Sequence, residues 1–112
     1  MKTHTVGIIM NGVTGRMGTN QHLLRSIDAI IKQGGVQVGP EEVIMPDPIL
    51  VGRNETKLKN LIEISSVEKY TTDLDSVMND PAYPVYFDSQ TTLRRFDAVK
   101  QAAAAGKHVY CE

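Results

Sequence analysis

The chain has 112 residues, a formal net charge of −1 and 41% hydrophobic residues, which is enough for one hydrophobic core but not for two. Acidic and basic residues are mixed along the sequence, which argues against a nucleic-acid-binding arm and against a membrane-surface helix. Apolar runs fall far short of the roughly 20 residues that span a bilayer. With no expected signal peptide and a single cysteine, Cys111, we expect a cytoplasmic protein without disulfides.

The start of the chain combines an apolar run, a glycine-rich turn and an amphipathic segment. Residues 5–10 (TVGIIM) predict a short strand, and an apolar i, i+3, i+4, i+7 stripe predicts a helix over 16–33. Glycines at positions 12, 15 and 18 lie at the junction, at a spacing of three. Such a strand–turn–helix points the unpaired N–H groups and the positive dipole end of the helix at an anion.

The three glycines favour a dinucleotide as that anion. In such turns one glycine makes the turn, one lets the backbone approach a pyrophosphate, and one packs the helix on the strand. No Gly-Lys-Ser or Gly-Lys-Thr follows, which argues against a P-loop. A turn with a purely structural role is the alternative.

The next segments predict a second strand and a second helix. Residues 34–47, rich in glycine, proline and acidic side chains, are predicted to be a loop or a small hairpin. Residues 48–51 predict the second strand. Asn54 is expected to cap the helix that follows, which carries the apolar residues Leu58, Leu61 and Ile62.

Two more units follow the same order. Residues 67–71 predict the third strand, and Asp73 is expected to cap a short helix that ends at 79–81. The fourth strand is predicted over 85–87.

The last helix is expected to start at a capping Thr91 or Thr92 and to carry an apolar face that includes Phe96. Gly106 is expected to stop it, with Lys107 near its negative end, and residues 108–111 predict the fifth strand.

This alternation of strands and helices predicts an α/β fold. We expect a Rossmann-type, doubly wound parallel sheet in three layers, with strand order 3-2-1-4-5 and right-handed crossovers. In that order the ligand site lies at the carboxyl ends of strands one and four, where the order reverses. The loops at this place are residues 11–18 and 88–92.

The residues after the second strand predict which dinucleotide is bound. An acidic residue usually stands there and accepts hydrogen bonds from the adenosine ribose, but this chain has Arg53. A guanidinium binds a 2′-phosphate, whereas a carboxylate repels it. Arg53 therefore favours NADP over NAD, with Asn54 or Lys57 assisting. The alternative is that Arg53 is a solvated surface residue and Asn54 only a cap.

Residues 102–112 (AAAAGKHVYCE) resemble the A-G-K-H-V-x-C-E-K-P segment of the glucose–fructose oxidoreductase and inositol dehydrogenase family (Gfo/Idh/MocA). Residues 12–18 and 70–78 also resemble that family, so the likeness covers nearly the whole chain outside 34–47. The string Gly-Arg-Met-Gly occurs in dihydrodipicolinate reductases too, but the end of the chain argues for the first family.

The resemblance implies the cofactor domain of a two-domain enzyme that moves hydride between NAD(P) and a sugar, polyol or related substrate. It implies a pyrophosphate turn, an adenosine-selecting Arg53, a cofactor loop at 89–91 and a Glu112 near the nicotinamide ribose. The candidate cofactor-binding residues are Asn11, Gly12, Thr14, Gly15, Arg16, Met17, Gly18, Arg53, Asn54, Ser89, Gln90, Thr91 and Glu112.

Two departures from the family's pattern matter. The loop after the fourth strand reads D-S-Q-T-T-L-R at 88–94, where the family has A-T-P-N-x-x-H. The sequence also ends at Glu112, before the family's catalytic lysine and substrate domain.

We therefore expect residues 1–112 to be one dinucleotide-binding domain, inactive alone, whose full-length protein binds a small-molecule substrate. An apolar face left without its substrate domain implies weak self-association into a homo-oligomer. The alternative is a free-standing, non-catalytic nucleotide-binding module. We expect no metal site, because His4, His22, His108 and Cys111 lack ligand spacing.

Overall fold

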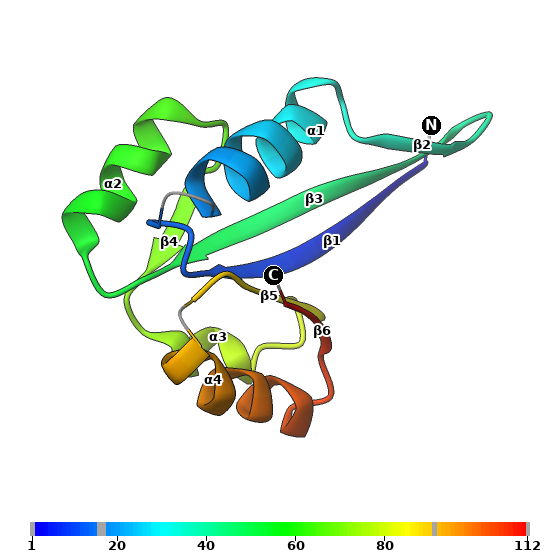
Figure 1. The fold of residues 1–112 in the computed structure, drawn as a ribbon. Coiled ribbons are helices and arrows are strands. Elements are labelled where there is room, and N and C mark those ends of the chain that lie inside the picture. The colour runs from blue at the N-terminus through cyan, green and yellow to red at the C-terminus, as the bar shows by residue number, and fades with distance from the viewer. Residues whose placement is uncertain (1, 16–17, 91, 112) are drawn as a thin grey trace.

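A twisted sheet forms the centre of the molecule in the computed structural model, which describes residues 2–15, 18–90 and 92–111 (Figure 1). The first strand, β1 (Lys2–Asn11), runs parallel to β3 (Glu42–Val51) along its whole length and to β5 (Val85–Asp88) along its last four residues. Outside β5 lies β6 (His108–Cys111), and β4 (Lys69–Thr71) pairs with the end of β3. The predicted parallel sheet is therefore confirmed.

The sheet order differs from the expected one at one edge. It runs β2-β3-β1-β5-β6, with β4 also on β3, because the segment predicted as a loop or small hairpin forms an antiparallel strand, β2 (Val36–Gly39). β2 pairs with the first residues of β3 and β4 with its last, so both lie along the same edge.

The strand β3 begins at Glu42, six residues before the predicted start. Pro46 and Pro48 argue against a strand there, because proline cannot donate a hydrogen bond to a ladder. They are accommodated because residues 45–48 pair only with β1, in the gap between the β2 and β4 pairings.

Helices cover both faces of the sheet and complete the three layers (Figure 1). On one face, α1 (Asp28–Lys32) and α2 (Glu55–Ile64) pack against the core that contains Met10, Leu50 and Phe87. On the other, α3 (Leu74–Met78) and α4 (Thr92–Ala104) pack against the core that contains Ile9, Ile49 and Tyr86. Successive strand residues thus point to opposite cores, as the two-residue period of a strand requires.

The first helix has two windings. Its first ten residues form a π-helix, η1 (Gly18–Ile27), which continues directly into α1. The apolar stripe predicted the helix but not this wider turn. No helix in the described part of the chain is long and apolar enough to cross a membrane.

Helix ends follow the sequence in part. Asn54 caps α2, since its Oδ1 accepts from the N–H of Lys57 at 3.1 Å. Asp73 occupies the N-cap position of α3, but its side chain makes no capping bond, so that expectation was wrong. The turn there is held instead by the Asp73 N–H, which donates to Thr71 Oγ1 at 3.0 Å.

One expectation about α4 was also wrong. Phe96 is 70% exposed, because Ala98 and Ala102 form the buried face and Phe96 projects from another side of the helix. Lys107 follows the end of the helix as expected, and its N–H donates to Ala102 O at 3.1 Å. Its Nζ donates to the carbonyls of Asp80 and Tyr83 before β5. Gly106 does end the helix, with a φ of +77° that favours glycine.

Candidate functional site

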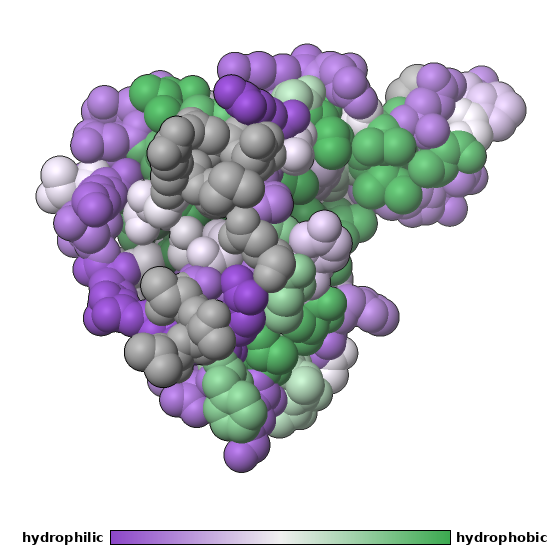
Figure 2. Space-filling view, in the orientation of Figure 1, coloured by the Kyte–Doolittle hydropathy of each residue, from purple (hydrophilic) through white to green (hydrophobic). Residues whose placement is uncertain are grey.

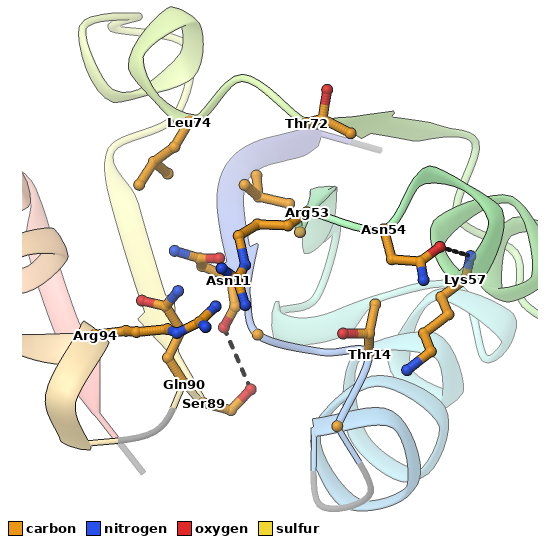
Figure 3. A pocket seen from close by; sticks show the side chains of 14 residues that line it. Asn11, Thr14, Arg53, Asn54, Lys57, Thr72, Leu74, Ser89, Gln90 and Arg94 are labelled. Atoms are coloured by element: carbon orange, nitrogen blue, oxygen red, sulfur yellow. Dashed lines mark hydrogen bonds between the residues drawn. The ribbon is translucent and has the colours of Figure 1, made fainter.

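A cleft of about 870 Å³ lies where β1, β3 and β5 end (Figure 3). This is the carboxyl edge of the parallel strands and the point at which the strand order reverses. Three loops form its walls, following β1, β3 and β5, and a fourth contribution comes from the loop after β4. The lining residues are Asn11, Gly12, Thr14, Gly15, Val51, Gly52, Arg53, Asn54, Lys57, Thr72, Leu74, Ser89, Gln90 and Arg94.

Gly12 lets two of these loops meet. Its φ is +87°, which side chains other than glycine rarely adopt, and its N–H donates to Val51 O at 3.3 Å. A Cβ at this position would lie 2.7 Å from the backbone nitrogen of Gln90. The first glycine of the turn is therefore required both for the turn and for close contact with the loop after β5. Gly15 then donates its N–H to Gly12 O at 3.3 Å.

A buried polar chain lies beneath the cleft. Asn11 Nδ2 donates to the Tyr86 hydroxyl at 2.9 Å, and that hydroxyl donates to Asp88 Oδ2 at 2.6 Å. Burial, and then the hydrogen bond to Asp88, raise the pKa of Tyr86 far above its ordinary value, so the hydroxyl keeps its proton. All three residues are buried. They join the ends of β1 and β5 side by side.

Asp88 also fixes the loop that follows β5. Its Oδ1 accepts from the N–H of Gln90 at 2.8 Å and from Arg95 Nε at 3.3 Å. Arg95 Nη2 in turn donates to Gln90 O at 3.0 Å. Ser89 is tied to β1, since its N–H donates to Asn11 O at 2.9 Å. The backbone that enters the cleft at 88–90 is thus held by a fully buried carboxylate.

The cleft is lined by cations without compensating acids. Arg53, Lys57 and Arg94 contribute to its walls, whereas no Asp or Glu is among the described residues that line it. All three side chains are on exposed residues, and within the described chain none of them has an ion-pair partner. Three positive charges beside a strand-end turn make the cleft suited to an anion that carries more than one negative charge.

Comparison with known proteins shows what the chain is similar to. No family model matches the chain. A D-xylose dehydrogenase of Paenarthrobacter nicotinovorans is 48% identical to it over 111 residues, which are 99% of this chain and 29% of that protein. The resemblance to the Gfo/Idh/MocA family is thus confirmed, over the N-terminal part of these relatives' length.

Solved structures share the fold. Levoglucosan dehydrogenase in complex with NADH and levoglucosan has a TM-score of 0.69 at 22% identity and covers 98% of this chain. Scyllo-inositol dehydrogenase from Lactobacillus casei, with bound NAD(H) and scyllo-inositol, has a TM-score of 0.63 at 21% identity and also covers 98%. The chain spans 27% and 28% of those two chains, so it corresponds to less than a third of each relative.

The cleft gathers most of the residues predicted from the sequence to bind the cofactor. Gly18 begins η1, and Arg16, Met17, Thr91 and Glu112 lie outside the described residues. The predicted residues that line the cleft are Asn11, Gly12, Thr14, Gly15, Arg53, Asn54, Ser89 and Gln90.

Sequence reasoning missed part of the cleft. It did not identify Thr72 and Leu74, which follow β4 at the same edge of the sheet, or Arg94 in the first turn of α4. Arg94 stands where the Gfo/Idh/MocA loop has histidine, which was an available signal. The role of Asp88 depends on contacts with Tyr86 and Arg95 that no local pattern encodes.

Proposed function

We propose that the chain binds a nicotinamide dinucleotide in this cleft, and NADP(H) in preference to NAD(H). The observation that carries the proposal is the set of uncompensated cations around the glycine turn, in a cleft at the switch point of a doubly wound sheet. The cleft suits such a ligand chemically, because it offers guanidinium and ammonium donors, a hydroxyl at Thr14 and backbone N–H groups.

The position of each loop suggests how the dinucleotide lies. The pyrophosphate would contact the turn at Gly12–Gly15, where the two glycines have no side chain to keep it away. The adenosine would lie toward β3 and β4, near Arg53, Asn54 and Leu74. The nicotinamide half would then extend past Ser89 toward β6. A bound dinucleotide of this class supplies a hydride carrier, and the residues of this chain bind and orient it.

Arg53 is the residue that we assign to the 2′-phosphate. It follows β3 directly, at the place where NAD-selective sites carry an acid, and it has no carboxylate partner in the described chain. A guanidinium can bind a phosphomonoester through two parallel hydrogen bonds. Lys57 lies one turn into α2 and adds a second positive charge on the same wall.

We further propose that residues 1–112 act as the dinucleotide-binding domain of an oxidoreductase with a sugar, polyol or related substrate. The names of the xylose, levoglucosan and scyllo-inositol relatives support that substrate class. In this proposal the substrate domain and the catalytic lysine belong to sequence beyond these residues. The share of the relatives that the chain spans supports this arrangement.

Calorimetric titration of the purified chain with NADPH and with NADH tests the proposal. We expect NADPH to bind at least about tenfold more tightly, because its extra phosphate adds charge-assisted hydrogen bonds. Arg53→Asp should remove that preference, whereas Arg25→Asp, a charge reversal on the exposed side of η1, should leave it intact. Equal affinities in the unchanged protein would overturn the NADP assignment, and binding of neither would overturn the site.

A further inference from the structure

Arg94 enters the cleft from the wall opposite Arg53. It lies in the first turn of α4, which follows β5, whereas Arg53 and Lys57 come from the β3 side, with β1 between them. In Figure 3 the side chain of Arg94 extends into the cleft from α4, and that of Arg53 extends into it from the segment after β3. Two guanidinium groups therefore approach one space in the cleft.

The arrangement is electrostatically unfavourable without an anion. Like charges that line one cleft repel, and neither arginine has an acidic partner in the described chain that would offset this. The neighbouring Arg95 is the contrast, since it pairs with the fully buried Asp88 at 3.3 Å. Of these two neighbouring arginines, Arg94 is the one that lines the cleft and has no acidic partner in the described chain.

The buried carboxylate of Asp88 determines which arginine faces the cleft. Successive helix residues point about 100° apart, so fixing one side chain fixes the direction of the next. Arg95 is held inward by Asp88 and by the carbonyl of Gln90. The contacts of Arg95 therefore fix the orientation of this helix turn, and Arg94 points into the cleft as a consequence.

We propose that Arg94 is a second specificity-determining residue, which binds the same 2′-phosphate as Arg53 from the opposite wall. This inference rests on the proposed function. A phosphomonoester carries a charge of about −1.5 to −2 at pH 7, which two guanidinium groups balance. Its three oxygens can accept hydrogen bonds from both sides at once, a geometry that suits the planar donors of arginine better than lysine.

The test is calorimetric titration of the Arg94→Ala chain with NADPH and with NADH. We expect the affinity for NADPH to fall by about tenfold to a hundredfold and the affinity for NADH to stay within about twofold. Lys100→Ala is the matched control, because it removes one positive charge from the exposed side of the same helix. Arg94→Lys should restore only part of the loss, since it returns the charge without the paired donors.

Two further readouts separate a phosphate contact from a general loss of charge. The affinity of the unchanged chain for NADPH should fall from pH 7.5 to 5.5, as the 2′-phosphate gains its proton near pH 6, and Arg94→Ala should flatten this dependence. Combining Arg53→Ala with Arg94→Ala should cost less than the sum of the two single losses, because both act on one group.

Equal losses for NADPH and NADH in Arg94→Ala would overturn the inference, since Arg94 would then contact a part common to both. An unchanged affinity for NADPH would overturn it as well. If NADPH preference depends on Arg53 but not on Arg94, only this inference fails. If the unchanged chain shows no NADPH preference, the proposed function fails first and this inference with it.

Discussion

The two ends of the parallel sheet differ in whether their positively charged side chains are bound by other residues of the protein. At the carboxyl end, Arg53, Lys57 and Arg94 surround the cleft without acidic partners in the described chain. At the amino end, Lys69 and Lys107 are both bound by the protein itself. The difference indicates where positive charge maintains the fold and where it is available to a ligand.

At the amino end, the two lysine ammonium groups donate hydrogen bonds to other residues of the protein. Lys69 Nζ donates to Asp47 Oδ2 at 2.8 Å and to the Tyr83 hydroxyl at 2.9 Å. Burial lowers the pKa of Lys69, but the hydrogen bonds outweigh it and raise the pKa above its ordinary value. Burial lowers the pKa of Lys107, whose donors are taken up by main-chain carbonyls. The close Tyr83–Lys69 pair therefore belongs to the fold, because both side chains are bound within the protein and neither residue lines the cleft.

The largest expected effect comes from Gly12→Ala. The new Cβ would meet the backbone of Ser89 and Gln90 at 2.7–2.8 Å and would force a positive φ on alanine. We expect a loss of about 3 kcal/mol in the free energy of unfolding, with loss of dinucleotide binding. Urea denaturation measures the first and calorimetry the second. Gly34→Ala is the control, since Gly34 has a similar φ of +94° but open space around it, and it should cost only about 1 kcal/mol.

The next effect lies at the amino end, at Asp28. This buried carboxylate accepts from the N–H of Ser66 at 2.6 Å and pairs with Lys32 at 3.1 Å. We expect Asp28→Ala to lower the free energy of unfolding by about 2 kcal/mol at pH 7, because the Ser66 N–H loses its acceptor. Dinucleotide affinity should not change. A loss of affinity would show that the two ends are coupled.

The cost of Asp28→Ala should depend on pH. Burial raises the pKa of Asp28, but the hydrogen bonds from Ser66 and Lys32 outweigh it and lower the pKa below its ordinary value of 3.8. A lowered pKa means that the stabilisation is complete above about pH 4 and is lost as the pH falls through the folded-state value. The difference between variant and parent should therefore shrink in acid. Asp97→Ala, which removes an exposed carboxylate from α4, should not lower the free energy of unfolding by a comparable amount at pH 7.

A smaller effect is expected for Lys69→Met. The ion pair with Asp47 is partly exposed, with 41% and 43% of the side chains accessible, so its contribution is at most about 1 kcal/mol. Thermal unfolding should detect a small destabilisation, while NADPH affinity stays within about twofold. Lys57→Met in the cleft should lower NADPH affinity and leave the unfolding temperature nearly unchanged. If both variants changed stability and affinity in the same way, the contrast between the two ends of the sheet would be refuted.

The smallest effect concerns inorganic phosphate. Cations without partners bind anions weakly, so phosphate should raise the unfolding temperature by about 2 °C over chloride at equal ionic strength. The combined Arg53→Ala and Arg94→Ala chain should lose this increment. An increment that survives both substitutions would place the anion elsewhere.

The sequence predicted the parallel strands and the position of the cleft because both depend on local patterns. Short β-branched runs and the glycines before η1 identify the strands and the turn, and topology then brings Arg53 and Ser89 to one edge. The early start of β3 was missed because Pro46 and Pro48 are tolerated only where the neighbouring strands leave a gap. Asp88 was missed because its role arises from contacts with Tyr86 and Arg95, whereas Arg94 had a signal in the loop pattern that was not used.

The first halves of β1 and β3 extend beyond the rest of the sheet, and this affects how the domain unfolds locally. β1 pairs with β3 from Lys2 onward but with β5 only from Ile8, so the first half of this strand pair projects beyond the helices with β2 beside it (Figure 1). Apolar residues, including Val36 at 40% and Val38 at 52% exposure, are accessible on this projection, and Figure 2 shows green patches there. Amide hydrogen exchange should therefore divide β3 in two. Residues 42–45 should exchange through local fraying, whereas residues 49–51, enclosed by two strands and both cores, should exchange only when the whole domain unfolds.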